Sequence, residues 1–218
     1  MKTITSILFV FFFTLSAFAE VSTSEREALI KLNQSTNGSQ WKIKWDLTAA
    51  TSTWYGVKIK DNKVVGLALP NNNLDGQIPT EISKLQYLET INLFKNNLSG
   101  NLPASIGDLK SLQTLNVSFN KLTGSIPASI GKATSLKVIE LYMNSLTGSL
   151  PQEIGQLTQL ENLSLFNNSL QGELPSSLYS LKNLKVLMLN SNNFSGKLSY
   201  EIENLKSLEN LSLFENNF

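Results

Sequence analysis

The side chains best suited to contact another molecule recur every 24 residues. One position of this repeat carries Phe94, Ser118, Tyr142, Phe166, Asn190 and Phe214. The next position carries Lys95, Phe119, Met143, Asn167, Ser191 and Glu215. The position two residues before the first carries Asn92, Asn116, Glu140, Ser164, Met188 and Ser212. These three columns are rich in aromatic residues, methionine and amides and poor in charge, which is the composition of the core of a protein interface.

Non-covalent recognition is therefore the chemistry that these columns favour. A contiguous exposed patch of apolar side chains commonly marks a binding site. The candidate ligand-binding residues are Phe94, Phe119, Tyr142, Met143, Phe166, Asn116 and Glu140. The alternative is that the aromatic side chains are ordinary for this repeat and only cover a sheet.

Catalysis has little support in the residue types present. The chain has no cysteine and no histidine, which excludes disulfides, thiolate or imidazole metal ligands, cysteine nucleophiles and histidine-based triads. Glu140 is the only acidic residue in the middle of the three columns, and no second carboxylate accompanies it there for acid–base work. The glycines recur with the turns, so they do not form a phosphate-binding loop. We expect a non-catalytic protein without a metal or another cofactor.

A repeated segment must position these side chains. Residues 85–108 read again as residues 109–132, further copies continue to Phe218, and a weaker first copy begins at Val64. Such self-similarity predicts stacked coils that bury their leucines against one another. Within one copy, the alternation around Leu115 predicts a short strand with one face inward, and the rest reads as coil turning around the core.

Three further columns are expected to fix the geometry of each coil. An asparagine ladder should bond backbone groups of its own and the adjacent coil, and it comprises Asn72, Asn96, Asn120, Asn144, Asn168, Asn192 and Asn216. A turn with positive φ is expected at Gly76, Gly100, Gly124, Gly148, Gly172 and Gly196. The return segment is stiffened by Pro79, Pro103, Pro127, Pro151 and Pro175. A column of alternating charge, best developed in Lys137, Glu161, Lys185 and Glu209, should support stacking.

The pattern LxxLxxLxLxxNxLxGxIPxxIGx resembles the leucine-rich repeat, in the 24-residue form of plant receptor ectodomains and related bacterial proteins. The resemblance covers residues 64–218, about seven repeats of which the last is incomplete. It implies an α/β repeat solenoid, a right-handed curved coil with a parallel β-sheet on its concave side. It also implies a second edge of short strands or turns near the LxGxIP segment.

Residues 20–63 are expected to form an N-terminal cap. The spacing of Ser24 and Glu27 predicts a capping box, an apolar stripe follows, and Asn37-Gly38 should end the helix. The open end of the first repeat is then expected to be covered by Trp41, Trp45 and Trp54. The alternative for these tryptophans is a platform that stacks on sugars. The segment resembles the cap of the same family, but Ser52 and Ile59 occupy the positions of the cysteine pair usual in plants, which favours a bacterial or microbial branch.

Residues 1–19 predict a secretory signal peptide. Lys2 precedes an apolar run, and Ala17-Phe18-Ala19 matches a small-x-small cleavage site. The alternative is an uncleaved membrane anchor, although the run is shorter than the ~20 residues of a spanning helix. We therefore expect a secreted or cell-surface protein without a membrane span in its mature chain.

The functional hypothesis is an exported module that recognises a protein or peptide through its concave face. The net charge of +1 does not favour nucleic acid or an anionic membrane as a partner. A carbohydrate-binding or adhesive surface protein is one alternative. The ectodomain fragment of a larger receptor-like sensor is another, because Phe218 stands in the column of Leu98, before the glycine and proline half of its repeat. A chain that ended at Phe218 is expected to be monomeric.

Overall fold

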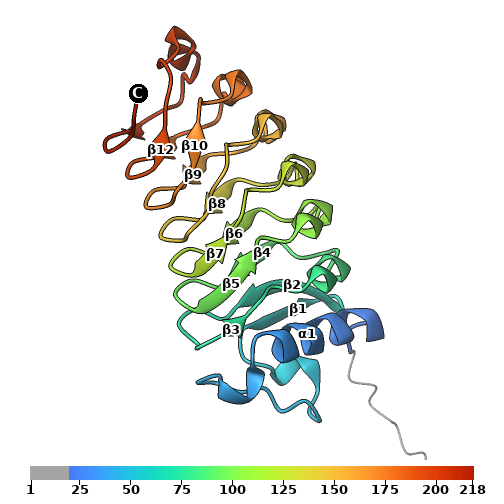
Figure 1. Cartoon of the computed structure of the whole chain (residues 1–218). Coiled ribbons are helices and arrows are strands. Elements are labelled where there is room, and N and C mark those ends of the chain that lie inside the picture. The colour runs from blue at the N-terminus through green and yellow to red at the C-terminus, as the bar shows by residue number, and fades with distance from the viewer. Residues whose placement is uncertain (1–19) are drawn as a thin grey trace, which may run out of the picture.

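The chain folds as an elongated stack of coils, seen in a computed structural model that describes residues 20–218 (Figure 1). The signal peptide expected over residues 1–19 lies outside the described residues. Among the helices of the described part, none combines the length and the apolar character needed to cross a membrane.

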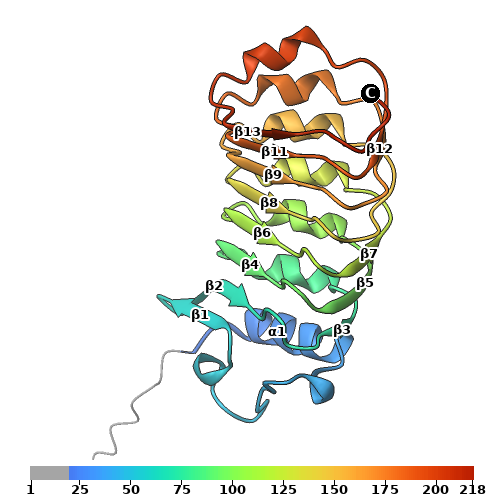
Figure 2. The ribbon, with the colours of Figure 1, turned by 90° about the vertical axis from the view of Figure 1, so that its left-hand side faces the viewer.

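One face of the stack is a continuous eight-stranded sheet (Figure 2). In spatial order its strands are β1 (Val57–Lys60), β2 (Lys63–Ala68), β4 (Thr90–Asn92), β6 (Thr114–Asn116), β8 (Val138–Glu140), β9 (Asn162–Ser164), β11 (Val186–Met188) and β13 (Asn210–Ser212). β1 and β2 form an antiparallel hairpin, and every later strand pairs in parallel with its neighbour. Equivalent core residues such as Leu115 and Ile139 face each other in the register. The predicted parallel sheet is confirmed.

A second, shorter edge runs along the stack, as the resemblance to the leucine-rich repeat implied. It consists of β3 (Asp75–Gly76), β5 (Asn97–Asn101), β7 (Lys121–Thr123), β10 (Gln171–Gly172) and β12 (Asn193–Phe194). β3, β5 and β7 pair in parallel, as do β10 and β12. The positive φ expected at the repeating glycine is present in every copy, and at Gly76 an added Cβ would lie 2.1 Å from the carbonyl oxygen of Ser35.

The side of the stack opposite the sheet carries 3₁₀-helices that the sequence pattern left as coil (Figures 1 and 2). These are η3 (Thr80–Lys84), η4 (Ala104–Asp108), η5 (Ala128–Lys132), η6 (Gln152–Gln156), η7 (Ser176–Ser180) and η8 (Tyr200–Asn204). A proline in extended conformation precedes each of the first five, and Ser199 precedes η8. Proline fixes φ near the helical value and needs no amide partner, which suits the entry to a tight helical turn.

The asparagine ladder lies at the inner bend of each coil. Asn144 Nδ2 donates to the carbonyl oxygens of Val117 (3.1 Å) and Leu141 (3.0 Å), and its Oδ1 accepts from Leu122 N (3.0 Å). The other ladder members from Asn96 to Asn216 repeat the pattern of bonds to their own and the preceding coil. Each side chain thereby pairs backbone groups that would otherwise be buried without partners.

The N-terminal cap begins with α1 (Thr23–Ser35), and its capping box differs from the predicted one. Ser22 and Glu25 form the box, and the pair Ser24 and Glu27 does not. Both pairs have the required spacing, but Glu25 is buried and its Oε1 also accepts from Val64 N (3.0 Å) at the start of the sheet. This tertiary bond selects the register, because it satisfies the helix start and a buried strand amide together. Beyond the helix, Asn37 takes a left-handed conformation with φ 56°.

The three tryptophans are part of the core, so a sugar-stacking platform there is wrong. Trp41 and Trp45 meet edge to face with centroids 4.9 Å apart, and Trp45 stacks on Trp54 at 4.8 Å. Each indole N–H donates to a backbone carbonyl oxygen at 2.8 Å. The rest of the cap contains the short 3₁₀-helices η1 (Gly38–Gln40) and η2 (Thr51–Thr53). The buried rings close the N-terminal end of the stack.

Candidate ligand-binding face

Two aromatic pairs lie just beyond the carboxyl ends of the sheet's strands. Phe94, Tyr142 and Phe166 each follow a strand of the eight-stranded sheet by two residues and are half-buried. The rings of Tyr142 and Phe166 are stacked, with centroids 4.5 Å apart and planes at 7°. Phe94 meets Phe119 edge to face at 5.8 Å. Each pair joins neighbouring coils, so rigid aromatic surface is presented at two places along the stack.

Ser118, which was expected to face outward between these pairs, is fully buried. Its hydroxyl donates to Asn116 Oδ1 at 2.6 Å, and its backbone N–H donates to the same oxygen at 3.1 Å. A short hydroxyl side chain can bond to its own chain in this way. The first column is therefore interrupted between Phe94 and Tyr142.

The second column lies in a left-handed turn and not on the strands. Its members have φ between 52° and 58°, and they are Lys95, Phe119, Met143, Asn167, Ser191 and Glu215. The turn is held by the next coil, since Phe119 N donates to the carbonyl oxygen of Tyr142 (2.9 Å) and Met143 N to that of Phe166 (2.9 Å). Asparagine tolerates this conformation, whereas bulky side chains disfavour it.

Phe119 is 42% exposed despite its unfavourable conformation. Asn167 shows that the same turn forms with a residue that prefers it. The strained backbone conformation at Phe119 and Met143 is therefore occupied by large apolar side chains although a smaller polar one would fit. The left-handed conformation recurs in every copy and belongs to the repeat, and it was hidden from the sequence pattern because the strands end earlier than their alternation suggests.

Asn116 and Glu140 contact each other on adjacent strands. Asn116 Nδ2 donates to Glu140 Oε2, and burial raises the pKa of the half-buried Glu140 carboxyl. No cluster of three or more metal-ligating side chains occurs in residues 20–218. The hydrogen-bond partner of Glu140 is an amide and not a second carboxylate.

The column of alternating charge forms an ion pair between two adjacent coils. Lys185 Nζ lies 2.7 Å from Glu161 Oε2, and this contact lowers the pKa of Glu161 and raises that of Lys185. Both side chains are largely exposed, so the pair adds little to stability.

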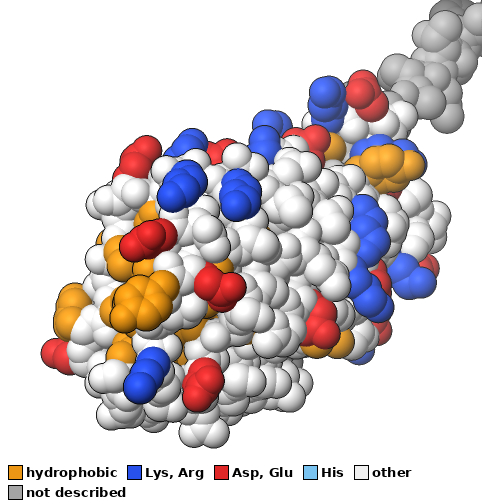
Figure 3. Space-filling view, turned by 90° about the horizontal axis from the view of Figure 1, so that it is seen from above, with side chains coloured by type: hydrophobic (Ala, Val, Ile, Leu, Met, Phe, Trp, Pro, Cys, Tyr) orange, Lys and Arg blue, Asp and Glu red, His pale blue; other side chains and the backbone are white. Residues whose placement is uncertain are grey.

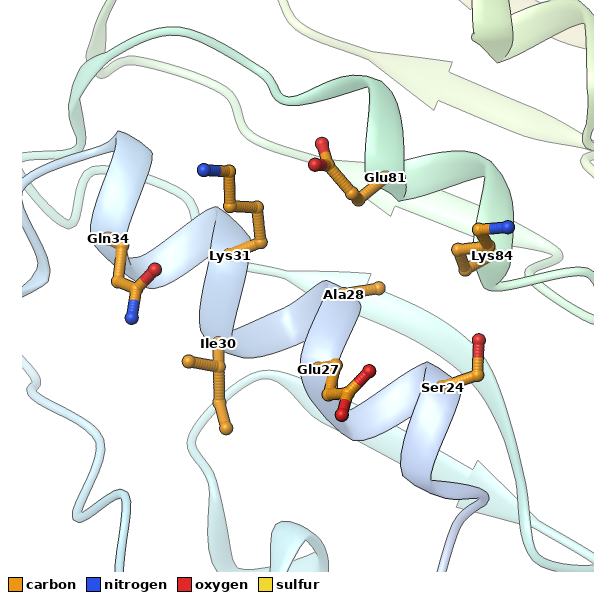
Figure 4. A pocket seen from close by; sticks show the side chains of 8 residues that line it. All are labelled: Ser24, Glu27, Ala28, Ile30, Lys31, Gln34, Glu81 and Lys84. Atoms are coloured by element: carbon orange, nitrogen blue, oxygen red, sulfur yellow. The ribbon is translucent and has the colours of Figure 1, made fainter.

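A cleft of about 370 Å³ lies between α1 and η3, on the helical side of the stack (Figure 4). Its charged side chains are balanced, with Glu27 and Lys31 from α1 and Glu81 and Lys84 from η3. The balance gives the cleft no preference for a ligand of either charge. At the other end of the molecule, apolar side chains gather over the last coil (Figure 3), where Leu211 is 44% exposed while its equivalent Leu187 is fully buried.

The stacked coils, the parallel sheet and the asparagine ladder define a repeat solenoid. A family model described as Leucine Rich Repeat matches residues 87–109, 111–133, 135–157, 159–181 and 183–205, more than half of the chain. The chain belongs to the leucine-rich-repeat family, and its repeats are of the plant-receptor-like type.

Two curated proteins match part of this chain in sequence. A probable leucine-rich repeat receptor-like protein kinase of Arabidopsis thaliana is 34% identical over 90 residues, which are 40% of this chain and 9% of the kinase. Polygalacturonase inhibitor 1 of the same plant is 32% identical over 91 residues, 39% of this chain and 28% of the inhibitor. The chain thus matches less than a third of the length of either relative.

Solved structures match over more of the chain. The crystal structure of PEPR1–AtPEP1 superposes with a TM-score of 0.82 at 30% identity, covering 89% of this chain and 28% of that one. The plant peptide hormone receptor RGFR1 in complex with RGF2 has a TM-score of 0.68 at 34% identity, covering 69% and 24%. A leucine-rich-repeat protein of Leptospira interrogans has a TM-score of 0.58 at 37% identity, covering 68% and 36%.

Proposed function

We propose that the protein is an exported, non-catalytic recognition module that binds a protein or peptide through its concave face, the side that carries the eight-stranded sheet. The stacked rings of Tyr142 and Phe166 carry the proposal, because they form a rigid aromatic surface on that face. Phe94, Phe119 and Met143 extend this surface, while Asn116 and Glu140 offer polar contacts beside it. The name "aromatic face" is used below for Phe94, Phe119, Tyr142, Met143 and Phe166.

Two features of the molecule support recognition. The aromatic face combines half-buried rings, which lose little entropy on binding, with the exposed Phe119. The similar RGFR1 is a plant peptide hormone receptor whose structure is known in complex with RGF2, and PEPR1 was crystallised with AtPEP1. The proposed export depends on the signal peptide predicted over residues 1–19, and the similar receptor-like kinase suggests a cell-surface or extracellular setting.

A carbohydrate ligand is the second candidate. Amide side chains gather near Phe119, where a polar cavity contains Asn71, Asn73 and Asn97. Amides beside an exposed ring can bond and stack on a sugar. A glycan array distinguishes this candidate from a protein ligand, since a protein-specific module gives no reproducible glycan signal.

The test is a capture experiment in the native surroundings, read by mass spectrometry. The baits are the wild-type protein, the double variant Tyr142→Ala/Phe166→Ala, and Tyr200→Ala, which removes a ring that is 93% exposed in η8, away from the sheet. We expect proteins or peptides captured by the wild type and the Tyr200 variant to be lost from the double variant. Thermal unfolding confirms that the double variant is folded. Equal capture by all three folded baits would contradict the proposal.

A further inference from the structure

A polar cavity opens where the N-terminal cap meets the first coils. Its volume is about 220 Å³, and on the same measure a single water molecule needs ~10–15 Å³. Its walls include Lys42, Asn71, Asn73, Lys95, Asn97 and Phe119. Phe119 also contacts Phe94, so the cavity is continuous with the aromatic face. The space suits one polar group together with a few carbon atoms.

The charged side chains that line the cavity are all positive. Lys42 and Lys95 are its only charged lining residues. Within residues 20–218, ion pairs join Arg26 to Glu20 and Lys185 to Glu161, and neither cavity lysine is in one. Lys42 Nζ instead donates to Asn71 Oδ1 at 2.9 Å. Two lysines therefore line one small space and neither is in an ion pair, which favours an anion there.

The amide wall of the cavity is held in place by its own hydrogen bonds. Asn97 Nδ2 donates to Asn73 Oδ1 (3.1 Å), and Asn73 Nδ2 donates to the carbonyl oxygen of Gln40 (2.9 Å). Asn71 is fixed by Lys42 and by its left-handed backbone, with φ 51°. A preorganised wall lowers the entropy lost when a ligand binds.

We propose that this cavity binds the side-chain carboxylate of an Asp or Glu residue of the peptide ligand. This proposal rests on the proposed function, because the ligand is taken to lie along the sheet face. Lys42 and Lys95 bind the carboxylate oxygens, and Phe119 contacts the neighbouring apolar atoms.

The position of the cavity also sets the direction of the ligand. Lys42 and Lys95 lie at the cap end of the stack, whereas Glu140 lies on β8 and Glu215 follows β13. An acidic group is attracted to these lysines and repelled by Glu140 and Glu215. The acidic part of the peptide therefore lies at the cap, and its apolar part lies over Tyr142 and Phe166.

The first experiment tests the cavity without any assumption about the natural ligand. The full chain is titrated with N-acetyl-aspartate amide, with N-acetyl-asparagine amide as its uncharged match, and the side-chain NH₂ signals of Asn71, Asn73 and Asn97 are followed by NMR. We expect these signals to shift with the aspartate compound and not with the asparagine compound. The absence of a selective shift would overturn the proposal. Galacturonate is a third titrant, and a stronger response to it than to the aspartate compound would assign the cavity to an acidic sugar and overturn the peptide assignment.

The second experiment measures selectivity with two random peptide libraries, one containing Asp and Glu and the other Asn and Gln in their place. The variant Lys42→Met/Lys95→Met removes both charges and keeps the apolar stems. Lys132→Met/Lys206→Met removes two exposed lysines outside the cavity as a control. We expect wild type and control to prefer acidic peptides by about tenfold, the size of a charge-assisted hydrogen bond, and the cavity variant to lose this preference.

The two proposals fail in different ways. If peptides bind and Tyr142→Ala/Phe166→Ala abolishes the binding, but the cavity variant keeps the acidic preference, the carboxylate site is wrong and the aromatic face stands. If no peptide binds, the proposed function fails, and the NMR titration still decides whether the cavity takes a carboxylate.

Discussion

Glu25 joins the cap helix to the repeat stack through Val64, 39 residues later in the chain. Its Oε1 accepts from Val64 N at 3.0 Å, while its Oε2 accepts from the Ser22 hydroxyl at 2.7 Å. One buried carboxylate therefore satisfies the start of α1 and a strand amide together. The cap and the first repeat form one hydrophobic core, and this bond sets the position of the helix on it.

Replacement of Glu25 by alanine is expected to lower the free energy of unfolding by about 2 kcal/mol, since it leaves Val64 N–H buried without an acceptor and removes the capping box. Glu27→Ala is the control, because Glu27 is exposed on the same helix and its loss should change stability by less than ~0.5 kcal/mol. Urea denaturation measures both. Equal effects of the two substitutions would contradict the role given to Glu25.

Replacement of Asn144 by alanine is expected to cost about 3 kcal/mol. The change leaves the carbonyl oxygens of Val117 and Leu141 and the N–H of Leu122 without their side-chain partner, and each unpaired buried group costs ~1–3 kcal/mol. Ser145→Ala, at the exposed neighbouring residue, should be close to neutral. Denaturant unfolding of the two variants provides the comparison, and a loss below 1 kcal/mol for Asn144→Ala would argue against the ladder as a main source of stability.

Phe119→Asn is expected to weaken ligand binding while leaving the stability of the fold nearly unchanged. Asparagine relieves the left-handed strain of a bulky residue, worth ~1–2 kcal/mol, but the edge-to-face contact with Phe94, worth ~0.5–1.5 kcal/mol, is lost. The melting temperature should therefore change little, while the affinity for the captured partner falls. Unchanged affinity in the folded variant would remove Phe119 from the aromatic face.

Glu140 should make stability depend on pH. Burial raises the pKa of its carboxyl in the folded state, so the folded protein binds the proton more tightly than the unfolded chain does. Its stabilising contribution is full below the unfolded pKa and is lost as the pH rises through the folded pKa. We expect Glu140→Gln to be more stable than the wild type at pH 7 and to match it below about pH 4. Chemical denaturation at the two pH values checks this, with the exposed Glu89→Gln as the control.

The repeat period was sufficient to predict stacked coils with a leucine core, and the resemblance to the leucine-rich repeat supplied the parallel sheet. A spacing of 24 residues places Leu115 beside Ile139 in the next coil, because equivalent residues of stacked coils must align. The expected direction of the ladder side chains followed from the same alignment. Periodicity thus determines which residues meet across coils.

Other features depend on hydrogen bonds that no single repeat contains. The choice of Ser22 and Glu25 over Ser24 and Glu27 depends on the amide of Val64, which lies in another part of the chain. The left-handed turn at Phe119 depends on the carbonyl oxygen of Tyr142 in the next coil. The polar cavity requires the cap to lie against the first turns, so sequence spacing alone did not reveal it.

Binding through the aromatic face is tested most directly by hydroxyl-radical footprinting of the protein with and without its captured partner. Aromatic rings and methionine sulfur are readily oxidised, so their protection reports contact. We expect Phe119, Tyr142, Met143 and Phe166 to become protected on binding. We expect Tyr200 and the exposed Tyr55 of the cap to be oxidised equally in both states. Unchanged oxidation of the aromatic face, with protection confined to the helical side of the stack, would contradict binding through that face.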